Sequence, residues 1–480
     1  MAHATPVLPP IPEPEARVTR APARERWSWA VYDFANTIWS MNVASLYFAT
    51  WLVVDLGASN TTYSWAAAIS SLLMAVSVPL LGAISDARRR RKPWVVGFTV
   101  LSCLATATLG IVGYTMAPLF GEGVLGAAVR PEGFRVAGTT LFFIALAFTV
   151  ANYAYQAAQP FYNAMMTDLV PPAEYGRLSG LGTAVGYVGT IVGLLLVAPF
   201  FEGALPVLGA LPEAFVSGVR SLVPFTGSAG RVSTFVPTAL LFLLFTLPLV
   251  VFCRDRNPAP AGTPIAWRAA FNEIARTIRE AKKYPGVLRF IVASFIYQDA
   301  VGTIVGVMGL YAIKAVGFDQ GAVNTLFVVL TVPAVLGSWI CGRLVDRMGA
   351  KRTLTWVLGC WTALLVAMIM APSQAAFWIV GAGIGFIFGG VPTAERPLLL
   401  SLIPDHEAGR FFSLMLLSSR AAAFVGPLVW GYTVDGFEPG MGTGFAYRAG
   451  VTTVAIFFAV SLFVLRGVPD RRLNAPAAAA

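Results

Sequence analysis

Three ionisable side chains lie deep within long apolar stretches of this 480-residue sequence, where each could bind an ion or a polar solute. Asp33 and Asp299 are carboxylates, and Arg420 carries a guanidinium. An unpaired charge in a hydrocarbon layer costs several kcal/mol, so such residues are candidates for function. Because a partly dehydrated carboxylate can take up and release a proton, Asp33 or Asp299 could couple proton movement to solute movement. The alternative is that both carboxylates bind helix ends and maintain the shape of the site.

Polar residues accompany both carboxylates at helical spacing. Asn36, Ser40 and Tyr47 follow Asp33 at successive spacings of three, four and seven residues, which places all four on one helical face. Since a polar stripe is unstable against lipid, we expect it to face a cavity between two halves of the protein. Asp299 has the corresponding position in the second half of the chain, on a face with Gly302, Thr303 and Gly306.

Arg420 has only small or apolar neighbours in its stretch and therefore requires an anion. Asp299, Asp33 or the carboxylate of a substrate could supply the negative charge. Alternatively, the long arginine side chain could extend to the membrane surface.

A further polar group occupies adjacent helical turns near residue 155. Its amides and hydroxyls could form hydrogen bonds with a zwitterionic or polar solute, or they could join neighbouring helices. Both interpretations stay open from the sequence. The members of this group are Asn152, Tyr153, Tyr155, Gln156, Gln159 and Tyr162.

Glu395 and Arg396 lie near the end of another apolar stretch. This stretch contains Gly389, Gly390 and Pro392, a combination that predicts a bending helix. We expect the two charged residues to form an ion pair at the mouth of the cavity rather than a ligand site.

Composition indicates the class of protein that positions these groups. Hydrophobic residues make up 57% of the chain and charged residues only 12%, whereas soluble proteins contain about 25% charged residues. The chain is therefore predicted to be a multi-pass membrane protein in contact with the lipid bilayer.

Of the 34 Lys and Arg residues, 26 fall on one set of alternate loops and tails and 6 on the other. The positive-inside rule explains the net charge of +10 without a nucleic-acid partner, and it predicts that both termini are cytoplasmic.

Twelve apolar stretches are long enough to cross a membrane as helices, which requires about 20 residues each. The predicted fold is all-α, with twelve transmembrane helices in two related bundles of six. The predicted spans are 28–54, 62–85, 94–115, 136–159, 178–200, 235–253, 287–313, 322–342, 353–371, 374–395, 410–433 and 447–466. The predicted organisation is a disordered tail at 1–26, a first half at 27–253, an amphipathic linker at 254–286, a second half at 287–466 and a tail at 467–480.

Two internal repeats indicate that the halves are related. One repeat, residues 169–177 and 402–410, shares five of nine residues and opens the fifth span of each half. The other is a Gly-x-x-x-Asp turn with a basic cluster after the second span of each half, where glycine permits close helix approach. Parallel repeats of this kind are typical of one large class of secondary transporters. The turn residues are Gly82, Asp86, Arg91 and Lys92 in the first half, and Gly342, Asp346, Arg347, Gly349, Lys351 and Arg352 in the second.

The sequence contains no recognisable catalytic or metal-binding pattern. The two histidines, His3 and His406, fall in the first tail and in a loop, and the four cysteines lack metal-ligand spacing. A phosphate-binding loop for ATP is also missing. We therefore expect no cofactor, no metal and no enzymatic activity, and we expect a monomer.

The basic turns resemble the signature Gly-x-x-x-Asp-Arg-x-Gly-x-Arg-Arg of the major facilitator superfamily. Within that superfamily the sequence is similar to the vacuole-effluxer branch, which contains the autophagy-related amino-acid exporters of fungal vacuoles. The resemblance covers about residues 27 to 466. The segments that carry it are 32–37, 161–163, 171–180, 297–299, 309–311, 411–412, 419–421 and 426–427.

This resemblance implies a secondary transporter that works by alternating access around a site formed by spans 1, 4, 7, 10 and 11. It implies amino acids or similar small organic solutes as substrates and export as the direction. The carboxylates Asp33 and Asp299 predict protons as the coupling ion, and the predicted location is the cell inner membrane. A non-transporting sensor or scaffold, or a transporter of sugars or drugs, is the alternative. The substrate and coupling candidates are Asp33, Asn36, Tyr153, Gln156, Asp299 and Arg420.

The resemblance also implies that the signature aspartates close the cytoplasmic mouth by pairing across the halves. Asp86 would pair with Arg410, and Asp346 with Arg177, because in the family these aspartates face the starts of spans 11 and 5. The alternative is a set of surface ion pairs worth about 0 to 1 kcal/mol each.

Overall fold

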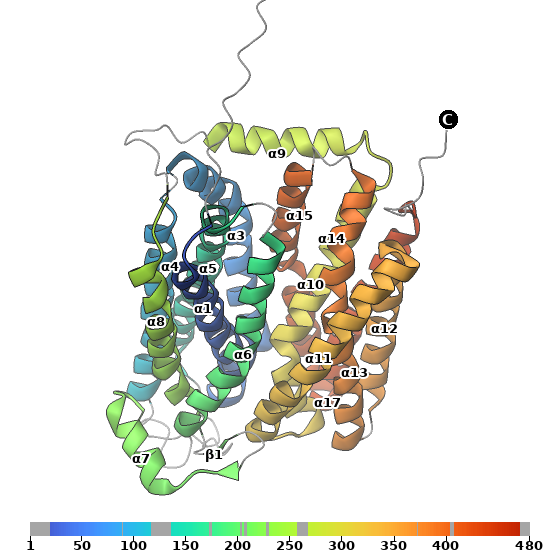
Figure 1. Ribbon diagram of the computed structural model, residues 1–480. Coiled ribbons are helices and arrows are strands. Elements are labelled where there is room, and N and C mark those ends of the chain that lie inside the picture. The colour runs from blue at the N-terminus through green and yellow to red at the C-terminus, as the bar shows by residue number, and fades with distance from the viewer. Residues whose placement is uncertain are drawn as a thin grey trace, which may run out of the picture.

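Two bundles of membrane-length helices stand side by side in the computed structural model of the protein (Figure 1). The structure describes residues 20–88, 90–116, 136–171, 175–201, 204–205, 209–226, 230–256, 267–371, 373–403 and 408–470. Within these residues, eleven helical segments are long and apolar enough to cross a membrane. Between its ends, a helix pairs its backbone N–H and C=O groups without water, which is why apolar stretches of this length form helices in a bilayer. The all-α fold predicted from the sequence is confirmed.

The first bundle begins with one long segment, Ala23–Asp55, whose later part contains π-helical stretches. Helix α5 (Gly138–Leu169) continues through Pro160, although the sequence predicted an end at residue 159. Proline is tolerated there because neighbouring groups in a membrane bundle satisfy the freed carbonyl. The other elements are α1 (Ala23–Trp39), η1 (Ser40–Tyr47), α2 (Phe48–Thr50), η2 (Trp51–Asp55), α3 (Asn60–Arg88), α4 (Lys92–Met116), α6 (Tyr175–Phe201), β1 (Ala204–Leu205), β2 (Gly209–Ala210), α7 (Glu213–Leu222), η5 (Arg231–Thr234) and α8 (Phe235–Phe252).

The second bundle contains two interrupted spans. The span predicted at 410–433 consists of two helices, α15 (Ala408–Ala422) and α16 (Val425–Met441). Pro427 lies in the first turn of α16, where its missing N–H is tolerated and where it cannot continue the ladder of a preceding helix. The bend predicted near residue 389 separates α13 (Gln374–Phe388) from α14 (Gly390–Leu402). The other elements are α10 (Val287–Tyr311), η6 (Ala312–Val316), α11 (Gln320–Met348), α12 (Ala350–Met370) and α17 (Thr443–Arg466).

Helix α9 (Trp267–Ala281) lies across one end of both bundles (Figure 1). It packs against α3 of the first bundle and α15 of the second. Its exposed residues include the apolar Phe271 and Ile278 beside the basic Arg276 and Arg279, so a helix of amphipathic composition forms where the sequence predicted one. Below, the end of the molecule at α9 is the linker face, and the opposite end is the far face.

Four glycines of α6 bring this helix into close contact with α1. A β-carbon at Gly189 would lie 2.5 Å from the Phe34 carbonyl oxygen, and one at Gly193 would lie 2.8 Å from the Ile38 side chain. Close backbone approach of this kind replaces the hydrophobic effect as the source of helix association in a bilayer. We call this contact the glycine seam; its glycines are Gly182, Gly186, Gly189 and Gly193.

Gly189→Ala is expected to destabilise the protein by about 1 to 3 kcal/mol, because the added methyl group must displace the α1 backbone. The measurement is the midpoint of thermal unfolding of the purified protein in detergent. Gly97→Ala in α4 is the matched control, since a β-carbon there meets no atom within 4 Å. Its midpoint should be unchanged or slightly higher. Equal midpoints for the two variants would contradict a tight seam.

Candidate functional site

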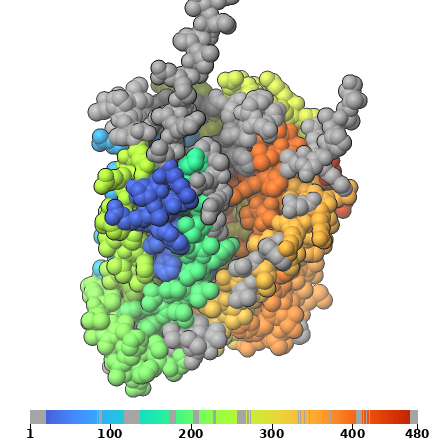
Figure 2. Space-filling view, viewed as in Figure 1, coloured from blue at the N-terminus to red at the C-terminus, as the bar shows by residue number. Residues whose placement is uncertain are grey.

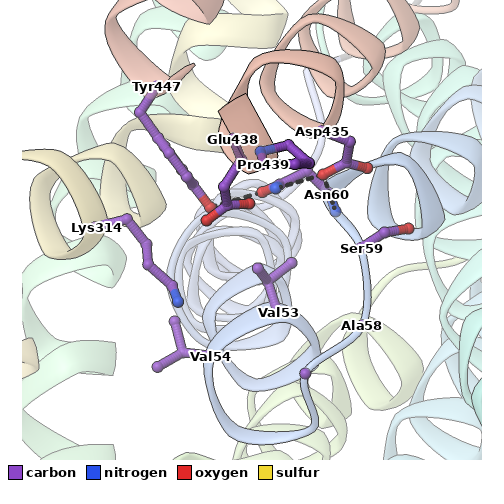
Figure 3. A pocket seen from close by; sticks show the side chains of 11 residues that line it. Val53, Val54, Ala58, Ser59, Asn60, Lys314, Asp435, Glu438, Pro439 and Tyr447 are labelled. Carbon is purple, nitrogen blue, oxygen red and sulfur yellow. Dashed lines mark hydrogen bonds between the residues drawn. The ribbon is translucent and has the colours of Figure 1, made fainter. Parts of the chain in front are cut away.

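One carboxylate joins the two bundles on the far face (Figure 3). Asp435 of α16 accepts hydrogen bonds at Oδ1 from the Asn60 backbone N–H (3.0 Å) and side-chain amide (2.7 Å). At Oδ2 it accepts hydrogen bonds from the Thr61 backbone N–H (2.7 Å) and hydroxyl (2.5 Å). The first N–H groups of a helix lack intrahelical partners and carry partial positive charge, so a carboxylate is favourable at the start of α3. We call Asp435, Asn60 and Thr61 the far-face clamp.

Other hydrogen bonds cross between the bundles around the clamp. The Asn324 amide donates to the Tyr47 hydroxyl (3.0 Å), so one member of the polar stripe predicted in span 1 contacts the second bundle. Helices α3 and α16 also pack directly against each other. The far face is therefore closed in this structure. Further cross-bundle bonds among the described residues are Tyr447 to Asn60 (2.7 Å), Trp65 to Tyr432 (3.0 Å), Tyr63 to the Gly306 carbonyl (3.2 Å) and Arg231 to Gln320 (2.9 Å).

A polar cavity of about 730 Å³ lies beside the clamp, and Figure 3 shows Lys314 and Glu438 on its wall. Glu438 accepts a hydrogen bond from Thr443 (2.9 Å) of its own bundle. Lys314 comes from the π-helical turn η6 after α10. This cavity therefore combines both signs of charge at the closed end of the molecule.

On the linker face, four of the described basic signature residues bind within their own bundles. Arg91 pairs with Asp168 at the end of α5 (2.9 Å), and Arg352 pairs with Asp470 (2.9 Å). Burial raises the pKa of Asp168 above its ordinary value, and the Arg91 guanidinium opposes that shift.

Gly349 connects α11 to α12 with a φ of 91°, a conformation that glycine adopts without strain. In addition, Lys92 donates to the Cys253 carbonyl (2.9 Å), Lys351 donates to the Arg466 carbonyl (3.4 Å), and Arg347 is exposed.

The close helix approach expected at the signature glycines is not found. A β-carbon at Gly82 would meet no atom within 4 Å, and one at Gly342 would meet Thr393 at 3.9 Å. Tight contact occurs instead at the glycine seam. The side chains of Asp86, Arg177, Asp346, Arg410 and Arg420 lie outside the described part of the structure, so the pairs expected for them stay proposals.

Asp33 and Asn36 bind groups of the first bundle. The Asp33 carboxylate rests against α6, since a β-carbon at Gly182 would lie 2.6 Å from Asp33 Oδ2. Asn36 donates to the Tyr155 hydroxyl (3.4 Å) and accepts from the Gln159 amide (2.7 Å). The structure thus joins span 1 to the polar group predicted on span 4.

Other members of that group join α5 to α3. The Tyr153 hydroxyl donates to the Ser77 hydroxyl (3.0 Å), and the Asn152 amide donates to Ser70 (2.7 Å). Gln156 is buried. These contacts correspond to the helix-joining alternative for Tyr153, and they leave its hydroxyl able to accept a further hydrogen bond.

Asp299 is 1% exposed and lies where α10 meets the break between α15 and α16. A β-carbon at Gly426 would lie 2.8 Å from Asp299 Oδ1, so the carboxylate reaches the start of α16. Within the described residues, Asp299 Oδ1 and the Thr303 hydroxyl have no hydrogen-bond partner. A buried oxygen without a partner is costly, and a bound proton would neutralise this carboxylate.

Glu395 lies inside the second bundle rather than in the expected ion pair at the cavity mouth. It is 4% exposed and accepts hydrogen bonds from Ser294 (2.5 Å), Tyr297 (2.8 Å) and Gln298 (2.8 Å) of α10, whereas Arg396 is exposed. Three donors satisfy a buried carboxylate better than one exposed arginine, which keeps its hydration. The signal for this site was present in the sequence, because the three donors share one helical face at spacings of three and one.

An apolar cavity of about 170 Å³ lies between the bundles; we call it the interbundle cavity. The first bundle contributes residues of η1 and α6, and the second contributes residues of α10, α11, α12 and α13. The walls thus come from spans 1, 5, 7, 8, 9 and 10, whereas the sequence predicted a site of spans 1, 4, 7, 10 and 11. On the side seen in Figure 2, α6 and α11 meet along the boundary between the bundles.

Comparison with known proteins agrees with this architecture. A family model described as the Major Facilitator Superfamily matches residues 34–427 and 290–480. The chain is 24% identical over 445 residues to the uncharacterized MFS-type transporter YxiO of Bacillus subtilis, covering 91% of this chain and 92% of that protein. It is 25% identical over 292 residues to autophagy-related protein 22 of Botryotinia fuckeliana, covering 54% of this chain and 45% of that protein.

A solved structure has the same arrangement of helices. It is a bacterial homologue of the human lysosomal transporter Spinster in an inward-facing, unoccupied conformation, with a TM-score of 0.65 at 14% identity. The match covers 94% of this chain and 98% of that one. The chain therefore belongs to the major facilitator superfamily, and it is a multi-pass membrane transporter rather than an enzyme.

Proposed function

We propose that this transporter moves a small organic solute, an amino acid or a similar molecule, by alternating access and exports it with proton coupling. The observation that carries the proposal is the far-face clamp. It joins the bundles through side chains and the start of one helix, and such contacts can break without unfolding either bundle. Amino acids are proposed because the sequence resembles the vacuole-effluxer branch.

The proposed orientation places the linker face in the cytoplasm, in accord with the positive-inside rule. The protein would act as a monomer in the inner membrane. In this orientation, the structure is closed toward the outside. During export, the clamp would open while the pairs Asp86 with Arg410 and Asp346 with Arg177 close the cytoplasmic mouth.

The proposed solute site uses polar groups of α1 and α5 together with Arg420 of the second half. Arg420 would bind the carboxylate of an amino acid, because a guanidinium on an apolar stretch needs an anion and can bind a carboxylate with two hydrogen bonds. Asn36, Tyr153 and Gln156 would supply further hydrogen bonds. Asp33 and Asp299 are the proposed proton carriers.

Flux of labelled amino acids in sealed proteoliposomes tests this function. Purified protein is expected to move at least one amino acid faster than empty vesicles do, and an imposed pH gradient should change the rate. Sugars and drugs are the comparison solutes, because they represent the other substrate classes that the fold can serve. Absence of flux for every solute would favour the alternative of a non-transporting sensor or scaffold.

A further inference from the structure

We propose that the exposed face of helix α9 binds anionic phospholipids of the membrane surface. This face joins an apolar pair of side chains to a group of basic ones, and we call it the α9 strip. Its described members are Phe271, Ile278, Arg279, Lys282 and Lys283. Lipid binding here requires neither the solute nor the coupling ion, whereas the assignment of the strip to the cytoplasmic leaflet rests on the proposed orientation.

The packing of α9 leaves an apolar face outside the bundles. Thr277 and Ala281 are four residues apart and are 3% and 0% exposed, so they form the face that contacts the rest of the protein. Phe271 and Ile278 are seven residues apart and therefore share a second face. They are 41% and 46% exposed. The described part of the protein thus leaves nearly half of this apolar pair open to its surroundings.

Basic residues accompany the apolar pair. Arg279 belongs to the last turn of α9, Lys282 and Lys283 follow the helix, and all three are exposed. Among the described residues none of these three cations forms an ion pair, whereas Arg276 pairs with Glu280 (3.0 Å). Long basic side chains can rest their hydrocarbon stems on an apolar surface while their charged ends reach a phosphate. Apolar and basic residues on one helix are typical of helices that lie in a membrane interface and prefer anionic lipids.

The length of α3 places α9 at the level of the lipid headgroups. Helix α3 has 29 residues, which extend about 44 Å at 1.5 Å per residue. The hydrocarbon core of a bilayer is about 30 Å thick, and the headgroups bring the total to about 40 to 45 Å. Exposed Leu73, Val76 and Leu80 indicate that α3 borders lipid. Because α9 packs against α3 and lies across its linker-face end (Figure 1), the α9 strip is within reach of phosphate groups.

Charge selects the class of lipid. The segment 267–283 contains five Lys and Arg residues and two Glu residues. Each Lys or Arg close to an anionic membrane surface raises the binding constant by about fivefold. A second copy of this chain would bring the same cations together and would be repelled. Since α9 packs against both α3 and α15, bound lipid would hold the connection between the two halves at the membrane surface.

Lipid-specific quenching tests the α9 strip in the full-length protein. Ala275→Cys places a thiol on the exposed side of α9, and a nitrobenzoxadiazole fluorophore is attached to it. The protein is placed in nanodiscs of phosphatidylcholine with about one tenth phosphatidylglycerol. A nitroxide quencher is carried near the headgroup either by the phosphatidylglycerol or by an equal amount of the phosphatidylcholine. The protein without the added cysteine gives the background.

Nitroxide on phosphatidylglycerol is expected to quench at least about twofold more strongly than nitroxide on phosphatidylcholine, because the basic residues enrich the anionic lipid. About 1 M salt should remove this preference, since the screening length then falls to about 3 Å. Equal quenching by the two lipids at low salt would overturn the proposal. A fluorophore that neither lipid quenches would show that protein covers the strip, and it would overturn the proposal too.

Charge substitutions locate the lipid. In the variant with both Arg279→Gln and Lys282→Gln, the two lipids should quench equally. The matched control combines Arg254→Gln and Arg347→Gln, which remove two exposed cations outside α9, and it should keep the preference for phosphatidylglycerol. A preference that survives in the α9 variant would place the anionic lipid elsewhere and overturn the proposal. None of these measurements involves solute flux, so a failure of the proposed function leaves their outcome unchanged.

Discussion

Asp435→Ala is expected to open the far face in a large fraction of molecules. The variant removes the acceptor for four hydrogen bonds that cross between the bundles. Hydrogen bonds to a charged group each contribute about 1.5 to 3 kcal/mol. Because water replaces some of these bonds in the open state, a net loss of about 3 kcal/mol is a reasonable expectation. That loss changes the ratio of closed to open molecules by on the order of 100-fold.

Labelling of a buried position under the clamp measures this change. Ser64 of α3 is fully buried and faces Gly431 of α16, where a β-carbon would lie 2.9 Å from the Ser64 β-carbon. The thiol introduced by Ser64→Cys should react with a maleimide much faster in the Asp435→Ala background. Background from Cys253 is low, because burial raises the pKa of this thiol to about 12 and leaves little thiolate near neutral pH.

Glu438→Gln is the matched control for the clamp. Glu438 lines the same far-face cavity, but it accepts a hydrogen bond from Thr443 of its own bundle. Labelling at position 64 should therefore stay at the rate of the parent protein. Equal labelling in the Asp435→Ala and Glu438→Gln backgrounds would show that the clamp does not hold the far face closed.

Asp299→Asn or Asp33→Asn is expected to remove the response of solute flux to a pH gradient. An amide has nearly the shape of a carboxylate but cannot take up and release a proton near neutral pH. A gradient of one pH unit can drive about tenfold accumulation when one proton is coupled to each solute. In the coupling variant, accumulation should fall to equal concentrations inside and outside the vesicles, while exchange of labelled for unlabelled solute continues.

The structure favours Asp299 over Asp33 as the proton carrier whose substitution removes the response of solute flux to a pH gradient. Asp299 is almost fully buried at the break between α15 and α16, and its Oδ1 is unpaired among the described residues. Asp168→Asn is the control, because this carboxylate pairs with Arg91 on the linker face. A full response to the gradient in both Asp299→Asn and Asp33→Asn would exclude these residues as proton carriers.

Hydrophobicity predicted the membrane helices well because the bilayer accepts few other backbone structures. It could not locate the break between α15 and α16. Pro79, Pro160, Pro199 and Pro333 lie inside continuous helices, whereas Pro427 follows a break. Whether a proline interrupts a helix depends on neighbours that satisfy the freed carbonyl, and those neighbours are distant in sequence.

The partners of the candidate-site residues could not be predicted from the sequence either. Asp435 lies beyond the end predicted for its span at residue 433, and nothing near it in the sequence indicates that it caps a helix 374 residues away. Glu395 was visible as a charged residue in an apolar stretch, but its donors come from a helix 97 to 101 residues earlier. Charge within an apolar stretch thus identifies candidates, while the partner depends on how the bundles pack.

The glycine seam determines where the first bundle can flex. Because α6 lies against the α1 backbone from Asp33 to Ile38, we expect these two helices to move together as one stiff unit. The seam ends where the π-helical stretch Ser40–Tyr47 begins, and this wider helix lies against α10 of the second bundle. π-Helical segments are frequent at functional positions. We therefore expect bending of the first bundle to be concentrated in this π-helical stretch, where the first bundle contacts the second.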